Sequence, residues 1–413
     1  MKIQKNLLAS LISESESMRE NEPSNRVKNS TMDKTRRIAI VVKCVPPYRF
    51  PVFKTLVNTA RFKARFFANM PWDWSVPNVR QTLDIVKPQA VTITRNTRHK
   101  KVGVKQEEPV TIPVLLPLSL LAYRPKMIIS GNMGPVSLIS VMIARLLRCP
   151  FVLWTEEIAS TAGEISRIQK ILRVLILPRT SAFLAWGKPA VDFIVSQGFD
   201  RDKVHYCAQA VDNDWWIEES READRDGIRE TLGLRGRTFL LIGQLISRKG
   251  FDKVMQAWSR LDRRMQEQNT LLVVGSGEDE EKLKQLAGDL DIPNIVFAGG
   301  KSHEELPEIY AAADVHVFPS LVDVWGMVVN EAMACGKPVL ASKYAGASQE
   351  LISNDGQFGE LIDPLDIDSM TPVLAHWIER EQLPSPTKLQ ERIQEVNFGV
   401  SVKAFEAVVD QLT

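Results

Sequence analysis

Hydrophobic residues in the first half of the chain come in short runs that alternate with helical patterns. The run from Arg37 to Val45 is almost continuously apolar, which is typical of a strand buried on both faces of a parallel sheet. Apolar residues recur with helical spacing at 135–147 and 188–197. This alternation predicts βαβ units and a parallel sheet. Further strands are predicted at 64–67, 90–94, 127–131, 151–155, 182–187 and 204–208.

The second half repeats this rhythm more regularly and predicts a second sheet. The fold class is therefore α/β, with two tandem Rossmann-like domains that face each other across a cleft. Ligands of such sheets bind beyond the carboxyl ends of the strands, so the cleft is the expected site. Strands are predicted at 238–245, 270–275, 295–298, 315–319 and 338–341, and helices at 252–261, 278–290, 304–312, 326–335 and 347–353.

Changes in composition suggest where the domains begin and end. Residues 1–34 are polar and lack periodicity, so a mobile tail is expected there. A charge-dense stretch at 213–236 is the expected linker between an N-terminal Rossmann-like domain at 35–212 and a C-terminal one at 237–395. Residues 396–413 form a C-terminal helix that could pack back toward the N-terminal domain.

The charge of the chain is distributed unevenly between its halves. Of the 413 residues, 1–210 hold 32 Lys and Arg against 15 Asp and Glu, whereas 211–413 hold 20 against 35. A basic half suits anionic lipid, phosphate or nucleic acid. Because no known nucleic-acid-binding module accompanies the charge, a nucleic-acid partner is not expected. Chance drift of surface charge is the alternative.

The residues that usually bind metals or form disulfides are few and scattered. The four cysteines have no C-x-x-C spacing, which fits reduced thiols in a cytoplasm. The five histidines show no metal-ligand spacing, so no metal site is expected. No run is long and apolar enough to cross a membrane, and a cytoplasmic protein is expected, one that could bind the inner membrane face peripherally.

Two segments of the second half carry candidate chemistry. In the turn 243–250, Arg248 and Lys249 stand between a strand and a helix, where cations suit phosphate oxygens. In the segment 315–340, Asp323 precedes a helix that begins near Gly326, and Glu331 follows inside that helix. Two carboxylates beside a helix N-terminus could hold sugar hydroxyls and an anion. The alternatives are a solvated basic turn, a capping Asp and a surface Glu.

These segments belong to a longer set of motifs that resembles a known family. The second half is similar to the retaining, nucleotide-sugar-dependent glycosyltransferases of the GT-B architecture, family four or glycosyl transferases group 1. The matching motifs are G-x-L-x-x-x-K-G at 243–250, V-G-x-G-x-x-x-x-x-L at 274–283, V-F-A-G at 296–299, the pattern from Leu306 to Ser320, an acidic pair of E-x7-E type at 323–331, and G-x-P-V at 336–339.

The resemblance implies that 35–212 is the acceptor-side domain and 237–395 the nucleotide-sugar-binding domain, and it implies a role for each matching residue. Lys249 would neutralise the donor diphosphate, with Arg248 and the turn residues Gly243 and Gln244 beside it. The N–H groups of Gly326, Met327 and Val328 would hold the distal phosphate and the donor sugar, and Asp323 would contact that sugar. Glu331 would bind the ribose hydroxyls, and Gly299 would face the base. No metal or other cofactor is implied.

Two positions depart from the family pattern. The first acid of the pair is Asp323 rather than Glu, so its carboxylate reaches one methylene less far. Gln244 stands where the family usually has Arg, and Gln cannot offset the charge of a phosphate. Arg248 could compensate for this loss. Both departures concern catalysis more than donor binding.

The first half resembles the family more weakly. Glu156 falls roughly where many members carry a His near the reacting carbon; a simple loop carboxylate is the alternative. The basic cluster at 95–101 and the amphipathic segment at 166–179 suit an anionic membrane surface, or else a basic edge on a buried helix.

Together these features predict an enzyme, a retaining glycosyltransferase that moves a sugar from a nucleoside diphosphate to a hydroxyl acceptor. The acceptor would be a glycan or a lipid-linked sugar, in polysaccharide, lipopolysaccharide or glycolipid assembly. The alternatives are a non-catalytic GT-B scaffold, a nucleotide-sugar-binding protein, and a sugar-nucleotide epimerase.

Overall fold

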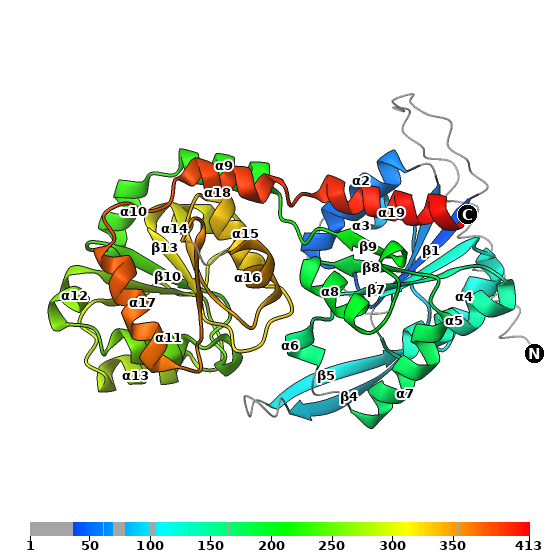
Figure 1. Ribbon diagram of the computed structural model, residues 1–413, viewed down its shortest axis with the longest axis horizontal. Coiled ribbons are helices and arrows are strands. Elements are labelled where there is room, and N and C mark those ends of the chain that lie inside the picture. Colours follow the sequence, from blue (N-terminus) through cyan, green and yellow to red (C-terminus); the bar gives the residue numbers. More distant parts are fainter. Residues whose placement is uncertain are drawn as a thin grey trace, which may run out of the picture.

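The computed structural model describes residues 36–60, 62–68, 79–98, 105–131, 133–162, 166–352 and 356–413, and the tail expected at 1–34 lies outside them. Two sheets form two neighbouring α/β domains (Figure 1). One sheet has seven parallel strands in the order β3-β2-β1-β6-β7-β8-β9, and the other has six in the order β12-β11-β10-β13-β14-β15. The predicted fold class is confirmed.

The N-terminal sheet is buried between two layers of helices. Ile38 to Val42 of its central strand β1 are all buried, as the apolar run predicted. Helix α2 packs on one face, and α4, α5, α7 and α8 cover the other. The strands are β1 (Arg37–Val42), β2 (Lys63–Ala68), β3 (Ile85–Val86), β6 (Met127–Gly131), β7 (Phe151–Thr155), β8 (Ala182–Trp186) and β9 (Val204–Cys207); the helices are α2 (Phe50–Thr59), α3 (Val79–Thr82), α4 (Leu116–Tyr123), α5 (Pro135–Leu147), α6 (Ala159–Ala162), α7 (Arg167–Ile176) and α8 (Lys188–Ser196).

The C-terminal sheet is covered on both faces as well. Its strands are β10 (Thr238–Ile242), β11 (Thr270–Val274), β12 (Ile295–Phe297), β13 (Val315–Phe318), β14 (Val339–Ser342) and β15 (Gly359–Ile362). Its helices are α9 (Asn213–Glu222), α10 (Arg225–Leu232), α11 (Phe251–Trp258), α12 (Arg263–Gln268), α13 (Glu280–Asp289), α14 (Leu306–Ala312), α15 (Met327–Ala334), α16 (Gly346–Leu351), α17 (Ile367–Glu379) and α18 (Pro386–Gln394), and α19 (Phe398–Leu412) ends the chain described.

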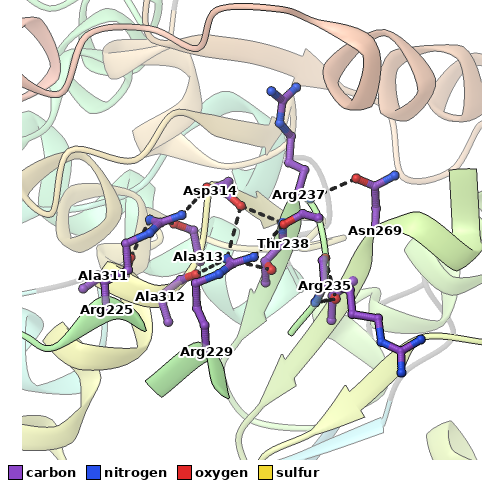
Figure 2. Close-up of polar contacts among 12 residues, drawn as sticks. Arg225, Arg229, Arg235, Arg237, Thr238, Asn269, Ala311, Ala312, Ala313 and Asp314 are labelled. Carbon is purple, nitrogen blue, oxygen red and sulfur yellow. Dashed lines mark hydrogen bonds and ion pairs between the residues drawn. The ribbon is translucent and has the colours of Figure 1, made fainter. Parts of the chain in front are cut away.

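The segment expected as a linker, 213–236, folds into α9 and α10 on the C-terminal domain. Trp216 of α9 is buried in that domain's core. Figure 2 shows how α10 is anchored: Arg225 and Arg229 converge on Asp314, at 2.7 and 3.5 Å. Asp314 also accepts from the amide of Thr238 at 2.8 Å. This cluster lies where β10 and β13 begin. The predicted site lies at the other, carboxyl ends of the same strands.

Two elements differ from the simple alternation of strands and helices. The stretch predicted as a strand at 90–94 belongs to a two-stranded antiparallel hairpin of β4 (Val91–Arg98) and β5 (Lys105–Ile112). Part of the basic cluster at 95–101 lies in β4, and 99–101 lie outside the described residues.

The last helix, α19, packs on the N-terminal domain against α2 (Figure 1). Its Phe405 meets the rings of Phe53, Trp154 and Trp186 at centroid distances of 6.3, 6.1 and 6.4 Å. The chain therefore passes between the domains twice, near Ala208 and near Asn397. Across the ranges that the structure describes, no helix combines the length and apolarity needed to cross a membrane.

Candidate functional site

The charged residues singled out in the C-terminal domain follow two neighbouring strands. The sheet continues from β10 to β11 and β12 on one side, and from β13 to β14 and β15 on the other. Its order therefore reverses between β10 and β13. Lys249 lies in the loop after β10, and Asp323 lies in the loop after β13. Open α/β sheets bind ligands in the crevice at such a reversal.

Lys249 and Asp323 form an ion pair across this crevice. Nζ of Lys249 donates to Oδ2 of Asp323 at 2.7 Å, and Nη1 of Arg248 lies 3.7 Å from the same oxygen. All three side chains are partly exposed, so a ligand can reach them. Two cations face one carboxylate, which leaves positive charge for an anionic ligand.

Two glycines allow the loops to approach each other this closely. Gly250 has φ +69°, and a Cβ there would lie 2.3 Å from the carbonyl oxygen of Pro319. Gly326 has φ +100°, and a Cβ there would lie 2.5 Å from the ring of Phe318. Glycine alone adopts these conformations without strain and leaves room for the neighbouring atoms. The two glycines in the predicted motifs thus shape the crevice.

Helix α15 begins beside the ion pair with an N-terminus that no side chain caps. Its N-cap is Gly326, and Met327 and Val328 are its first residues. The first N–H groups of a helix lack partners within the helix, and the helix dipole adds partial positive charge there. A phosphate can bind at such a position. Lys249 and the start of α15 therefore present positive charge to the same crevice.

Glu331 lies further along α15 and shares its environment with Lys249. Its side chain is partly exposed, yet burial raises the pKa of its carboxyl to about 7, against a weaker lowering by the Tyr310 hydroxyl and by Lys249. The hydroxyl of Tyr310 donates to Oε2 of Glu331 at 3.1 Å. The carboxyl therefore changes its charge near neutral pH.

The remaining predicted donor residues also follow the carboxyl ends of strands in this sheet. Gln244 is exposed in the turn after β10, next to Gly243, whose amide donates to the carbonyl of Val274 at 3.0 Å. Gly299 follows β12, two strands away from β10, and its carbonyl accepts from the amide of Gly275 at 2.9 Å. The structure thus brings Arg248, Lys249, Asp323 and Glu331 together. Gln244 and Gly299 lie at the same carboxyl ends of the strands but outside this group.

Glu156 comes from the N-terminal domain and is held by a residue that the sequence analysis missed. Oε1 of Glu156 accepts from Nη2 of Arg49 at 2.7 Å, and the same nitrogen donates to Gln209 at 2.6 Å. Arg49 is only 2% exposed, and its guanidinium carbon lies 3.4 Å from the ring centroid of Trp186. A buried arginine follows the first strand, and that position was the only sequence signal that could have indicated it.

A chain of buried hydrogen bonds continues from Arg49 into the C-terminal domain. The carbonyl of Gln209 accepts from Nδ2 of Asn330 at 2.8 Å, and Oδ1 of Asn330 accepts from Nε1 of Trp325 at 2.8 Å. Trp325 directly precedes Gly326 at the start of α15. The Glu156 loop and the start of α15 are therefore connected through buried side chains.

Charged residues of both domains change the pKa of Tyr48. Its phenol pKa rises to about 12, mainly because of burial and then because of the charge of Glu156, with a smaller contribution from Asp323. Carboxylates of both domains therefore influence the titration of Tyr48. Among the described residues, no group of three or more His, Cys, Asp or Glu side chains is placed to share a metal ion.

Comparison with protein families identifies the C-terminal part of the chain. Residues 224–396 match the family model of glycosyl transferases group 1. This match covers the C-terminal domain from α10 to α18. The matched region contains Lys249, Asp323 and Glu331, so the resemblance predicted from the motifs is confirmed.

Curated relatives match over part of their length. A GDP-mannose-dependent alpha-(1-6)-phosphatidylinositol monomannoside mannosyltransferase of Mycolicibacterium smegmatis is 36% identical over 156 residues, which are 36% of this chain and 40% of the relative. Mannosylfructose-phosphate synthase of Agrobacterium fabrum is 27% identical over 225 residues, 52% of this chain and 49% of the relative. The chain thus spans less than half the length of these relatives.

Solved structures resemble both domains of this chain. The Anabaena protein HepE in complex with UDP matches with a TM-score of 0.71 and 15% identity over 91% of this chain and 100% of its own. The apo form of the lipopolysaccharide outer core galactosyltransferase WaaB matches with a TM-score of 0.65 and 14% identity, over 91% and 99%. At these identities the likeness shows the two-domain GT-B fold.

Proposed function

We propose that this chain is a retaining glycosyltransferase that moves a sugar from a nucleoside diphosphate to a hydroxyl acceptor. The observation that carries the proposal is the meeting of Lys249, Asp323 and the start of α15 at the reversal of the sheet order. That position combines a cation, a carboxylate and open N–H groups. These are the groups that a diphosphate and a neighbouring sugar require.

On the donor side, the positive groups stabilise the departing diphosphate. The bond between the anomeric carbon and the diphosphate oxygen breaks, and its electron pair leaves with the diphosphate. Lys249, Arg248 and the N–H groups at 326–328 meet this charge without rearranging, which is how preorganised groups lower a barrier. Asp323 contacts the sugar, Glu331 accepts from the ribose hydroxyls, and the edge near Gly299 receives the base.

On the acceptor side, an oxygen of the acceptor forms the new bond to the same carbon. With retention it attacks from the side that the diphosphate leaves, so the departing phosphate oxygen is the nearest base for the hydroxyl proton. Positive charge develops on the sugar in between, and the carboxylate of Glu156, held by Arg49, stabilises it. Closure of the two domains excludes water from this reaction.

The names of the relatives suggest which substrates to test first. The Mycolicibacterium relative is named for GDP-mannose and a phosphatidylinositol mannoside, and HepE was solved with UDP. We propose GDP- and UDP-sugars as donors and a glycan or lipid-linked sugar as acceptor, in polysaccharide, lipopolysaccharide or glycolipid assembly. The four free cysteines support a reducing, cytoplasmic location.

The first experiment is a thermal-shift panel with UDP, GDP, ADP and their sugars, with and without magnesium. Specific binding raises the melting temperature by mass action. We expect a shift with one base that does not depend on magnesium. The preferred donor is then incubated with hydroxyl acceptors, and the anomeric configuration of the product is read by NMR. An inverted product, or release of the sugar only to water, would contradict the proposal.

A second candidate is a protein that binds a nucleotide sugar without transferring it. Gln244 and Asp323 favour this reading, since each departs from the family pattern. Donor binding without transfer to any acceptor, followed by transfer in Gln244→Arg, would support it. A third, an epimerase, would convert the nucleotide sugar with no acceptor present.

A further inference from the structure

The exposed apolar side chains of the described residues are concentrated on one side of the N-terminal domain. Nine of the thirteen large exposed hydrophobic residues lie on, or directly before, α4, α5 and α7. These three helices pack side by side over one face of the sheet (Figure 1). The nine residues, called the outer face here, are Val114, Leu115, Leu118, Met142, Leu146, Ile168, Ile171, Val174 and Leu175.

Helix α7 shows most clearly that this exposure is not incidental. Leu172 and Ile176 already supply the contacts with the domain core. Ile168, Ile171 and Val174 add a second apolar strip that is 60, 59 and 70% exposed. A surface helix needs a single apolar stripe to pack on its domain. The second strip is therefore free to contact something outside the domain, as large exposed apolar patches commonly do.

The charge around the outer face has one sign. Helices α4, α5 and α7 contain no Asp or Glu at all. Arg145 and Arg148 are exposed at the end of α5, and Arg167 and Lys170 are exposed on α7. Arg173 is different, because it pairs with Glu157. An apolar strip with cations beside it matches the boundary between acyl chains and anionic headgroups.

We propose that the outer face binds the surface of an anionic lipid bilayer, with its apolar side chains in the acyl boundary and its cations on the headgroups. A second copy of this chain suits the face less well, because pairing two such faces would bring two sets of cations together. The binding is peripheral and needs no nucleotide, so it goes beyond the proposed transfer reaction.

The outer face is also connected to the cleft. Arg173 of α7 holds Glu157, and Glu156 is the next residue along the chain. Glu156 belongs to the proposed acceptor side, where Arg49 holds it. A bilayer bound at α7 would therefore lie one helix away from the loop that contains Glu156. If the proposed function holds, a lipid-linked acceptor in that bilayer would reach the acceptor side from there.

The test is co-sedimentation of the full chain with vesicles, in the absence of nucleotide. Vesicles of phosphatidylcholine with phosphatidylglycerol should retain the protein, and phosphatidylcholine alone should retain much less. Because each basic side chain strengthens binding to an anionic surface about fivefold, Arg145→Gln/Arg148→Gln/Lys170→Gln should weaken it by on the order of a hundredfold. Ile168→Ser/Ile171→Ser/Val174→Ser should weaken it at least about tenfold.

Matched variants elsewhere on the surface are the controls. Lys54→Gln/Arg264→Gln/Lys388→Gln removes exposed charge, and Leu365→Ser removes an exposed apolar group, in both cases away from the outer face. Both should bind like the wild type, as should Lys249→Ala, which separates this test from the donor site. Equal retention by neutral vesicles, or equal loss in the control variants, would overturn the proposal. A dimer in vesicle-free sedimentation that Ile168→Ser/Ile171→Ser/Val174→Ser abolishes would also overturn it, in favour of a second copy.

Discussion

Nζ of Lys249 donates to Oδ2 of Asp323 at 2.7 Å. The two residues predicted to bind the donor therefore pair with each other in the structure. They come from loops after neighbouring strands and meet only because the sheet order reverses between those strands. A diphosphate that enters must share or displace the carboxylate.

Replacing Asp323 with Asn should separate binding from chemistry. The change removes the negative charge that competes with a diphosphate for Lys249, so the free nucleoside diphosphate should bind about fivefold tighter, equivalent to roughly 1 kcal/mol. The amide loses the acceptor charge for the donor sugar, so kcat should fall at least about tenfold. Isothermal titration and steady-state rates measure the two effects. Equal weakening of both would contradict this role.

The raised pKa of Glu331 predicts a pH-dependent cost to the fold. Its carboxyl titrates near 4.5 when unfolded and at about 7 when folded. Between these values the folded state binds more protons, so the free energy of unfolding falls as the pH rises through this window. The cost is complete above pH 7 and amounts to at most about 3 kcal/mol.

Glu331→Gln should remove that cost. The variant should match the wild type near pH 4.5 and be more stable at pH 8, as measured by urea unfolding at both pH values. Glu308→Gln, at an exposed position on α14, is the control and should keep the wild-type slope. A wild-type slope in Glu331→Gln as well would show that another group is responsible.

Arg49→Met should destabilise the fold by about 3 kcal/mol, because it leaves the carboxylate of Glu156 and the amide of Gln209 without their buried donor. Adding Glu156→Gln removes the uncompensated charge and should recover part of the loss. Thermal unfolding of both variants measures this. If the losses of stability in Arg49→Met and Glu156→Gln simply add in the double variant, the ion pair is not supported. Arg49→Lys should not restore stability, since an ammonium cannot stack flat on Trp186.

Gly187→Ala should loosen the contact between the domains. Gly187 has φ +91°, and a Cβ there would lie 2.5 Å from the ring of Trp325. Gly198 has φ +88° with nothing within 4 Å, so Gly198→Ala has the backbone strain alone. That strain costs about 1–2 kcal/mol, and the clash should add at least about 1 kcal/mol. Only Gly187→Ala should also weaken nucleotide binding, because Trp325 precedes the start of α15. Equal losses in the two variants would contradict this.

The sequence pattern predicts the features that depend only on neighbouring residues, namely buried strands and glycine turns. Strand β1 follows from an apolar run, and Gly250 and Gly326 mark turns whose conformation favours glycine. The charged composition of 213–236 predicts a linker, whereas the segment forms α9 and α10. Those charges are used in contacts with distant residues, as between Arg225 and Asp314.

Contacts between distant segments were not predictable from the pattern. Arg49 and Glu156 are 107 positions apart and meet only after both domain layers have formed. A lone arginine after a strand looks like any surface residue until Trp186 is placed beneath it. The pairing of Lys249 with Asp323 likewise depends on which strands become neighbours. Each residue was recognised as a candidate, but their contact was not.

The most direct test of donor binding at Lys249 uses one titration. The nucleoside diphosphate preferred in the thermal-shift panel is titrated into the wild type, Lys249→Ala and Lys253→Ala. Lys253 lies one turn further along, on α11, where it pairs with Asp252. We expect Lys249→Ala to raise Kd at least about tenfold, since a charge-assisted contact to phosphate is lost, and Lys253→Ala to leave Kd unchanged. Wild-type affinity in Lys249→Ala would show that the diphosphate does not bind at the meeting point of β10 and β13.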